Sequence, residues 1–154
     1  MDILRKSMAP ICDKAWEEIN DSATEVLTSV LSARKFVDVD GPKGWDFPAL
    51  SLGRVDVPKQ QGGDVQYGIH QVLPLIETRV PFELNIWELD NIARGAKDID
   101  LDNMEEAARK LARFEEDAIY NGFKAGNIKG IKDCSDHDAL ILPDNDDEII
   151  GVIS

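Results

Sequence analysis

The chain has 154 residues, of which 43% are hydrophobic, and this is enough apolar material for the core of one ordinary globular domain. It carries 30 acidic residues against 17 basic ones, which gives a formal net charge of -13 at pH 7. That charge would repel a phosphate backbone or an anionic membrane surface. We therefore expect neither nucleic acid nor a membrane among its partners.

The cysteines and the first residues indicate a cytoplasmic protein. Cys12 and Cys134 lie far apart without CxxC spacing, so no disulfide framework is predicted and a reducing compartment fits. The opening stretch MDILRKSMAPICDKAW is interrupted by charges, which leaves no apolar segment for a signal peptide. No run of about 18 apolar residues occurs that could span a bilayer.

Apolar residues spaced three and four apart predict a first long helix over about residues 14–33, with Asp13 as its N-cap. These residues are Trp16, Ile19, Ala23, Val26, Leu27, Val30 and Leu31. A strand is predicted at residues 36–39, where the period shortens, and Gly41 and Pro42 then break the chain.

Two alternating runs, residues 49–57 and 65–69, flank the turn-rich residues 60–64 and predict a long β-hairpin. The apolar content of this hairpin is low, and a two-stranded ribbon is marginal in water. It therefore needs a surface to lie against, and another copy of the chain is one such surface.

The clearest strand pattern covers residues 76–84 and is followed by a short helix, which Asn85 and Glu88 cap and Gly95 ends. A second long helix is predicted to open at residues 102–105 and to end at Gly122 or Gly126. A short strand at residues 139–142 and a new element from Glu148 complete the chain. The mixture predicts an α+β fold.

Several patterns are typical of sites, but each has a simpler interpretation. Residues 98–103 begin with the DxDxD pattern of a calcium-binding loop but lack the glycine and the bidentate glutamate of such a loop. An acidic first turn of a helix is therefore the better interpretation. The second acidic cluster, residues 144–148, also lacks the glycine that a calcium-binding loop needs. Cys134 and His137 have CxxH spacing without a matching second pair. No metal site is therefore predicted.

No GxSxG, P-loop or GxGxxG motif is present, and we predict that the chain is not an enzyme. Asp38 and Asp40 could form a paired-carboxylate site, but solvent-facing positions on an alternating strand are the favoured interpretation. Trp87 lies off the apolar face of its helix and could stack a flat ligand with Arg79. The alternative is that Trp87 packs against a neighbouring element or subunit.

Four stretches of the chain, in family order, resemble the encapsulin shell proteins, also known as linocin-like bacteriocins. The stretches are LRKSMAPICDKAWEEI at residues 4–19, ARKFVDVDGPKGW at 33–45, LPLIETRVPFELNIWELDNIARG at 73–95 and ARKLARFEEDAIYNGFKAGNIKGI at 108–131. Shell proteins of this family share the HK97-type fold of tailed-phage capsid subunits.

The resemblance implies a division of the chain into three segments. Residues 1–48 correspond to the N-terminal helix and lead-in strand, and residues 49–72 correspond to the extended arm that pairs with neighbouring subunits. Residues 73–154 correspond to part of the peripheral domain, with its long spine helix. The axial domain is missing, so the chain resembles an N-terminal fragment that other copies or a complementary C-terminal fragment would complete.

The resemblance also implies a structural function. Such subunits self-assemble into an icosahedral nanocompartment that encloses ferritin-like proteins or dye-decolourising peroxidases, through a C-terminal targeting peptide, in iron storage or oxidative-stress defence. Arg34 and Asp38 are candidates to anchor that peptide, and Val30, Leu31 and Val37 are candidates for its apolar wall. No cofactor is required, although some shells hold flavin, for which Arg79 and Trp87 would be the place.

Two further functions stay open at this point. One is a bacteriocin-like or proteolytic activity, as the linocin name suggests, against which the missing nucleophile argues. The other is a small acidic protein that binds a metal or a flavin.

Overall fold

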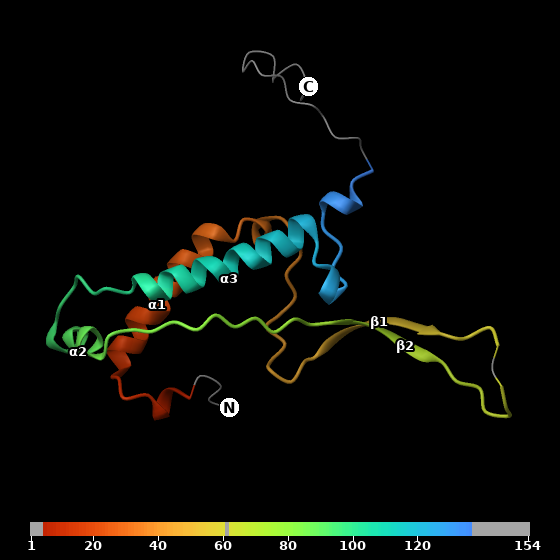
Figure 1. Ribbon diagram of the computed structural model, residues 1–154, viewed down its shortest axis with the longest axis horizontal. Coiled ribbons are helices and arrows are strands. Elements are labelled where there is room, and N and C mark those ends of the chain that lie inside the picture. The colour runs from red at the N-terminus through yellow and green to blue at the C-terminus, as the bar shows by residue number, and fades with distance from the viewer. Residues whose placement is uncertain (1–4, 61, 137–154) are drawn as a thin grey trace, which may run out of the picture.

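The structure, a computed structural model, describes residues 5–60 and 62–136. A helical body lies at one end and a long two-stranded hairpin projects from it (Figure 1). The longer elements are α1 (Asp13–Val30), β1 (Ala49–Asp56), β2 (Ile69–Pro74), α2 (Ile86–Arg94) and α3 (Asp102–Asn121). Short 3₁₀ turns occur at η1 (Lys6–Met8), η2 (Ala33–Lys35), η3 (Lys124–Gly126) and η4 (Lys132–Cys134). This mixture of helices and a small sheet confirms the α+β prediction.

Helix α1 is close to its predicted range, but Cys12 and not Asp13 is the N-cap. The helix ends at Val30 and the chain continues into the turn η2. The strand predicted at residues 36–39 is wrong. The backbone N–H groups of Phe36 and Val37 donate to the carbonyl of Ala33, and the Phe36 ring packs 6.0 Å from that of Tyr120. A local turn and an aromatic contact therefore replace the strand pairing.

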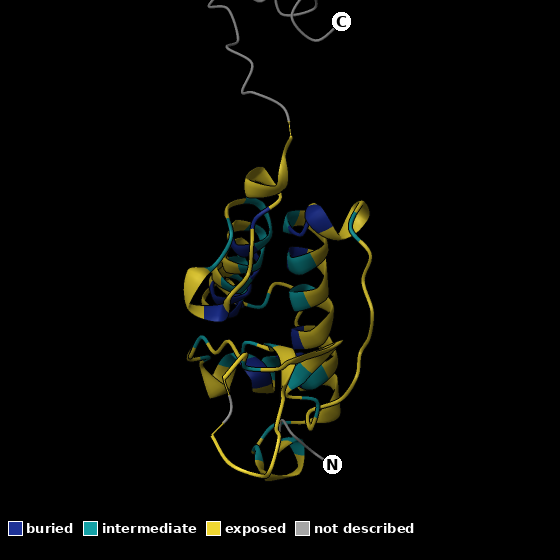
Figure 2. Cartoon of the chain, turned by 90° about the vertical axis from the view of Figure 1, so that its right-hand side faces the viewer, coloured by how far each residue is buried: buried dark blue, intermediate teal, exposed yellow. Residues whose placement is uncertain are grey.

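The predicted hairpin is confirmed. Strands β1 and β2 pair antiparallel, from Ala49 opposite Pro74 to Asp56 opposite Ile69, with an irregularity between Ser51 and Val55. Strand β2 begins at Ile69, later than the pattern indicated. Almost every residue of the two strands is exposed, and Figure 2 shows the contrast with the helices. The strands β1 and β2 therefore contribute no residue to the core.

The strand predicted at residues 76–84 is wrong as well. The chain runs extended along the helical body from the foot of the hairpin to α2 (Figure 1), but no described residue pairs with it as a neighbouring strand. Ile76, Val80 and Leu84 are half-buried, whereas Thr78 and Phe82, the other residues of the predicted apolar face, are exposed. A strand also needs a backbone partner, which the alternation of side chains does not specify.

Asn85 and Gly95 bound α2 as predicted, whereas Glu88 accepts a hydrogen bond from Asn91 within the helix, and the cap of α3 differs from the prediction. Asn85 accepts a hydrogen bond from the Trp87 N–H at 2.9 Å, and Gly95 ends α2 in the left-handed conformation at φ 98°. Leu101 is the N-cap of α3, so Asp102 lies inside its first turn. Gly122 follows the last residue of α3, as one of the two predicted positions.

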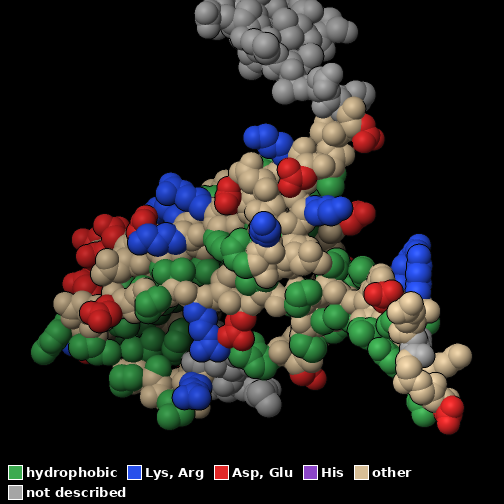
Figure 3. Space-filling view, turned by 45° about the vertical axis from the view of Figure 1, so that its right-hand side comes forward, with side chains coloured by type: hydrophobic (Ala, Val, Ile, Leu, Met, Phe, Trp, Pro, Cys, Tyr) green, Lys and Arg blue, Asp and Glu red, His purple; other side chains and the backbone are tan. Residues whose placement is uncertain are grey.

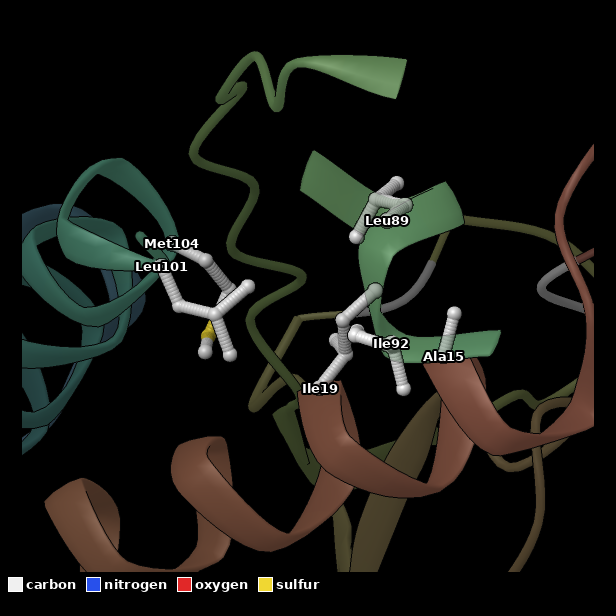
Figure 4. Packing of buried hydrophobic residues seen from close by; sticks show 6 residues of the cluster. All are labelled: Ala15, Ile19, Leu89, Ile92, Leu101 and Met104. Atoms are coloured by element: carbon white, nitrogen blue, oxygen red, sulfur yellow. The ribbon is translucent and has the colours of Figure 1, made fainter. Parts of the chain in front are cut away.

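The core lies where the three helices meet. The buried members of the cluster at this place are Ala15, Ile19, Leu89, Ile92, Leu101 and Met104 (Figure 4). Helices α1, α2 and α3 are thereby joined into one body. Among the residues that the structure describes, no helix is long and apolar enough to cross a membrane.

Four predictions concern residues outside the described ranges. These are the strand at residues 139–142, the CxxH partner His137, the acidic residues 144–148 and the element from Glu148. The three-segment division into residues 1–48, 49–72 and 73–154 stays a prediction.

Candidate functional site

A pocket of about 790 Å³ lies between α1, α3, the foot of the hairpin and the extended chain after β2. Its apolar lining includes Leu27, Leu31, Leu75, Ile76, Phe114 and Ile119. Three charged side chains, Arg34, Lys35 and Glu115, also line it. Hydrophobic side chains reach the surface over the helical body and along the hairpin (Figure 3). An apolar cavity with a few polar groups is typical of a binding site.

Beside the pocket, Glu116 of α3 holds the chain where α1 ends. One carboxylate oxygen accepts the hydroxyl of Ser32 at 2.5 Å, and the other accepts the N–H of Ala33 at 2.9 Å. The Tyr120 hydroxyl lies 3.1 Å from the Ser32 hydroxyl. The bond from Ser32, followed by the bond from Ala33, lowers the pKa of Glu116, because both stabilise the ionised form.

Glu115, the residue before it, pairs with Arg34. The guanidinium donates from Nε to Oε1 at 2.5 Å and from Nη2 to Oε2 at 2.8 Å, which is a bidentate pair. The hydrogen bond to Glu115 raises the pKa of Arg34. Both side chains are partly exposed, so the pair contributes little to stability and mainly orients the guanidinium.

No local sequence pattern indicated these contacts, because they join residues more than 80 positions apart. Glu115 and Glu116 looked like ordinary polar residues of a helix surface. Only the packing of α1 beside α3 gives them partners.

The predicted cargo-peptide residues are partly brought together. Leu31 is buried, and it lines the pocket together with Arg34. Val30 and Val37 are half-buried and Asp38 is exposed, and these three are not part of the pocket lining. The assignment of all five to a cargo peptide stays a prediction.

Arg79 and Trp87, the predicted flavin residues, do not converge. The Arg79 guanidinium lies 5.9 Å from the centre of the Trp45 ring and forms an ion pair with Glu77. Trp87 is 69% exposed, and among the described residues Arg79 makes no cation–π contact with it. This arrangement does not fit a ready-made stacking site, and flavin binding stays an untested prediction.

The acidic residues near α3 behave as helix-terminal groups. Asp100 accepts the N–H of Asp102 at 3.1 Å, and Asp102 and Glu105 lie in the first turn of α3. Within residues 5–60 and 62–136, no group of three His, Cys, Asp or Glu side chains is placed to hold a metal ion. Cys12 and Cys134 are free and exposed.

Comparison with known proteins places the chain in a family. The sequence model of the family described as "encapsulating protein for peroxidase" matches residues 1–154. The chain belongs to the encapsulin shell protein family. The type 1 encapsulin shell protein of Rhodospirillum rubrum is 45% identical over 159 residues, which cover 99% of this chain and 57% of that protein. The type 1 encapsulin shell proteins of Mycolicibacterium paratuberculosis and Mycobacterium tuberculosis are 39% and 38% identical, and each alignment covers 100% of this chain and 58% of the relative.

The encapsulin resemblance deduced from the sequence is thereby confirmed. The chain spans less than three-fifths of the length of these curated encapsulin relatives. The pocket and the pairs that Glu115 and Glu116 form lie within the matched part.

Proposed function

We propose that this chain is part of a structural shell subunit, without catalytic activity of its own, that assembles with further copies into a closed icosahedral compartment. The subunit would have the HK97-type fold of phage capsids and act in the cytoplasm. Membership of the encapsulin family supports the shell role.

The exposed hairpin is the observation that carries this proposal. Its apolar side chains include Leu52, Val55, Ile69 and Val72, which are 44–61% exposed. The helical body covers none of them, and a solitary ribbon with such a surface is marginal in water. Pairing with neighbouring subunits would bury this surface. Copies of the same subunit or a complementary C-terminal fragment are the proposed partners.

The contents of the compartment are the second part of the proposal. The family description, "encapsulating protein for peroxidase", supports an enclosed enzyme. We infer a dye-decolourising peroxidase or a ferritin-like protein that carries a C-terminal targeting peptide, in oxidative-stress defence or iron storage. The pocket beside α1, with Leu31 and Arg34 in its lining, is the proposed docking place of that peptide.

Electron microscopy of the purified protein, with mass spectrometry of what co-purifies, tests both parts. We expect hollow particles of uniform size that contain an enzyme with a short C-terminal extension. Particles emptied of this enzyme should have no peroxidase or proteolytic activity. A protein that remains a small, soluble monomer in size-exclusion chromatography would contradict the shell function.

A further inference from the structure

Arg34 and Glu115 meet in the lining of the pocket between α1 and α3. The two side chains are 51% and 34% exposed, so the pair lies where the pocket opens to solvent. A ligand that enters the pocket from solvent would therefore meet this pair.

The geometry of the pair leaves Arg34 able to bind something else. A guanidinium carries five N–H donors in one plane, and Glu115 accepts two of them, one from Nε and one from Nη2. The remaining donors, on Nη1 and Nη2, lie away from this carboxylate. Because Glu115 already restrains the side chain, Arg34 would lose less conformational freedom on donating to a ligand.

Glu115 offsets the charge of Arg34 through two hydrogen bonds, and Lys35 is a second cation in the lining. The rest of the lining is mainly apolar. A guanidinium whose charge is already offset, at the opening of an apolar pocket, suits an uncharged peptide segment that fills the cavity and offers a carbonyl oxygen to Arg34. An acidic side chain would meet Glu115 as a like charge.

We propose that Glu115 is a specificity-determining residue of this pocket. By offsetting the charge of Arg34, it makes the pocket accept an uncharged apolar peptide segment and discriminate against an acidic one. This inference rests on the proposed cargo function and adds to it a preference of the same site for uncharged over acidic peptides.

The test uses two synthetic peptides that share a sequence rich in leucine and isoleucine and differ at one position, which is asparagine in one and aspartate in the other. Each peptide carries a fluorophore and is equilibrated with the wild-type protein and with Glu115→Gln. The control variant is Glu106→Gln, an equal change of charge on α3 at a residue that pairs with Lys110 and does not line this pocket. Fluorescence anisotropy gives the ratio of the two affinities.

The wild-type protein and Glu106→Gln should prefer the asparagine peptide by the same ratio. In Glu115→Gln the relative affinity for the aspartate peptide should rise roughly two- to fivefold, as expected for one exposed charge, and the gain should shrink at high salt. An unchanged ratio in Glu115→Gln, with both peptides bound, would overturn the proposed role of Glu115 in discriminating against acidic peptides. It would not affect the proposed docking function of the pocket. If the wild-type protein bound neither peptide, the proposed docking function would fail with it.

Discussion

Ser32, just after α1, donates its hydroxyl to Glu116 of α3 at 2.5 Å, across 84 positions of sequence. The same carboxylate accepts the Ala33 N–H, so one side chain holds two consecutive residues of the turn that follows α1. The buried Ala33 N–H, at the start of η2, has no backbone acceptor among the described residues and needs another one. Glu116 supplies it and fixes where the chain leaves α1, beside the pocket.

Removing the Glu116 carboxylate should loosen this turn. In Glu116→Ala the Ala33 N–H loses its acceptor, so its hydrogen exchange should accelerate roughly two- to tenfold, the range expected for one hydrogen bond. The Ile131 N–H, which donates to Ile119 at 2.8 Å, serves as an internal control and should keep its rate. Equal exchange of Ala33 in both proteins would show that the hydrogen bond is not formed in solution.

The contribution of Glu116 to the stability of the folded protein should fall at acidic pH. Its hydrogen bonds with Ser32 and Ala33 lower its pKa in the folded state. The contribution is therefore complete above the ordinary glutamate pKa of about 4.3 and disappears as the pH falls through the lower folded value.

The urea midpoint of the wild-type protein should thus exceed that of Glu116→Gln by a constant amount near neutral pH. The difference should narrow below about pH 4. A difference that persisted unchanged in acid would mean that the ionised carboxylate is not what stabilises the turn.

Truncation of Ile19 should destabilise the protein. This side chain is 8% exposed and packs among Leu89, Ile92 and Met104, so Ile19→Ala would leave a cavity where the helices meet. We expect a loss of about 2–4 kcal/mol. Val65→Ala, at a position that is 81% exposed, should change stability by less than about 0.5 kcal/mol. Thermal unfolding at one protein concentration measures both, because assembly would also shift the transition.

Gly130 should not tolerate a side chain. A Cβ there would lie 2.5 Å from the carbonyl carbon of Asn121, 2.5 Å from the nitrogen of Gly122 and 2.6 Å from the oxygen of Tyr120. Because these are backbone atoms, the end of α3 would have to shift, and Gly130→Ala should cost about 1–3 kcal/mol. Gly62→Ala, where a Cβ meets nothing within 4 Å, is the matched control. Similar melting temperatures for the two variants would contradict this close approach.

A charge on the hairpin should prevent assembly without unfolding the subunit. Val55 lies on β1 opposite His70, is 47% exposed and belongs to no buried cluster. Val55→Asp should therefore keep the wild-type circular dichroism and lose the large particles in size-exclusion chromatography, since a charge would be buried between subunits. Val55→Thr preserves the shape of the side chain and should assemble. Particles formed normally by Val55→Asp would exclude this face from the subunit contact.

Local patterns in the sequence determined where α1, α2, α3 and the hairpin form, because helix periodicity, strand alternation, caps and turn residues act over a few neighbouring positions. The resemblance to encapsulins also came from the sequence. The two strand predictions at residues 36–39 and 76–84 were wrong, because a strand depends on a backbone partner that alternation cannot specify.

Tertiary structure decided which further residues join the candidate site. Leu31 and Arg34 could be singled out from the sequence, but Glu115, Glu116 and Tyr120 could not, because their partners are more than 80 positions away. Their contacts arise only when the apolar faces of α1 and α3 pack together and bring these polar groups within hydrogen-bonding distance. Side-chain chemistry is a local property of the chain, whereas the meeting of two such groups depends on how the whole chain packs.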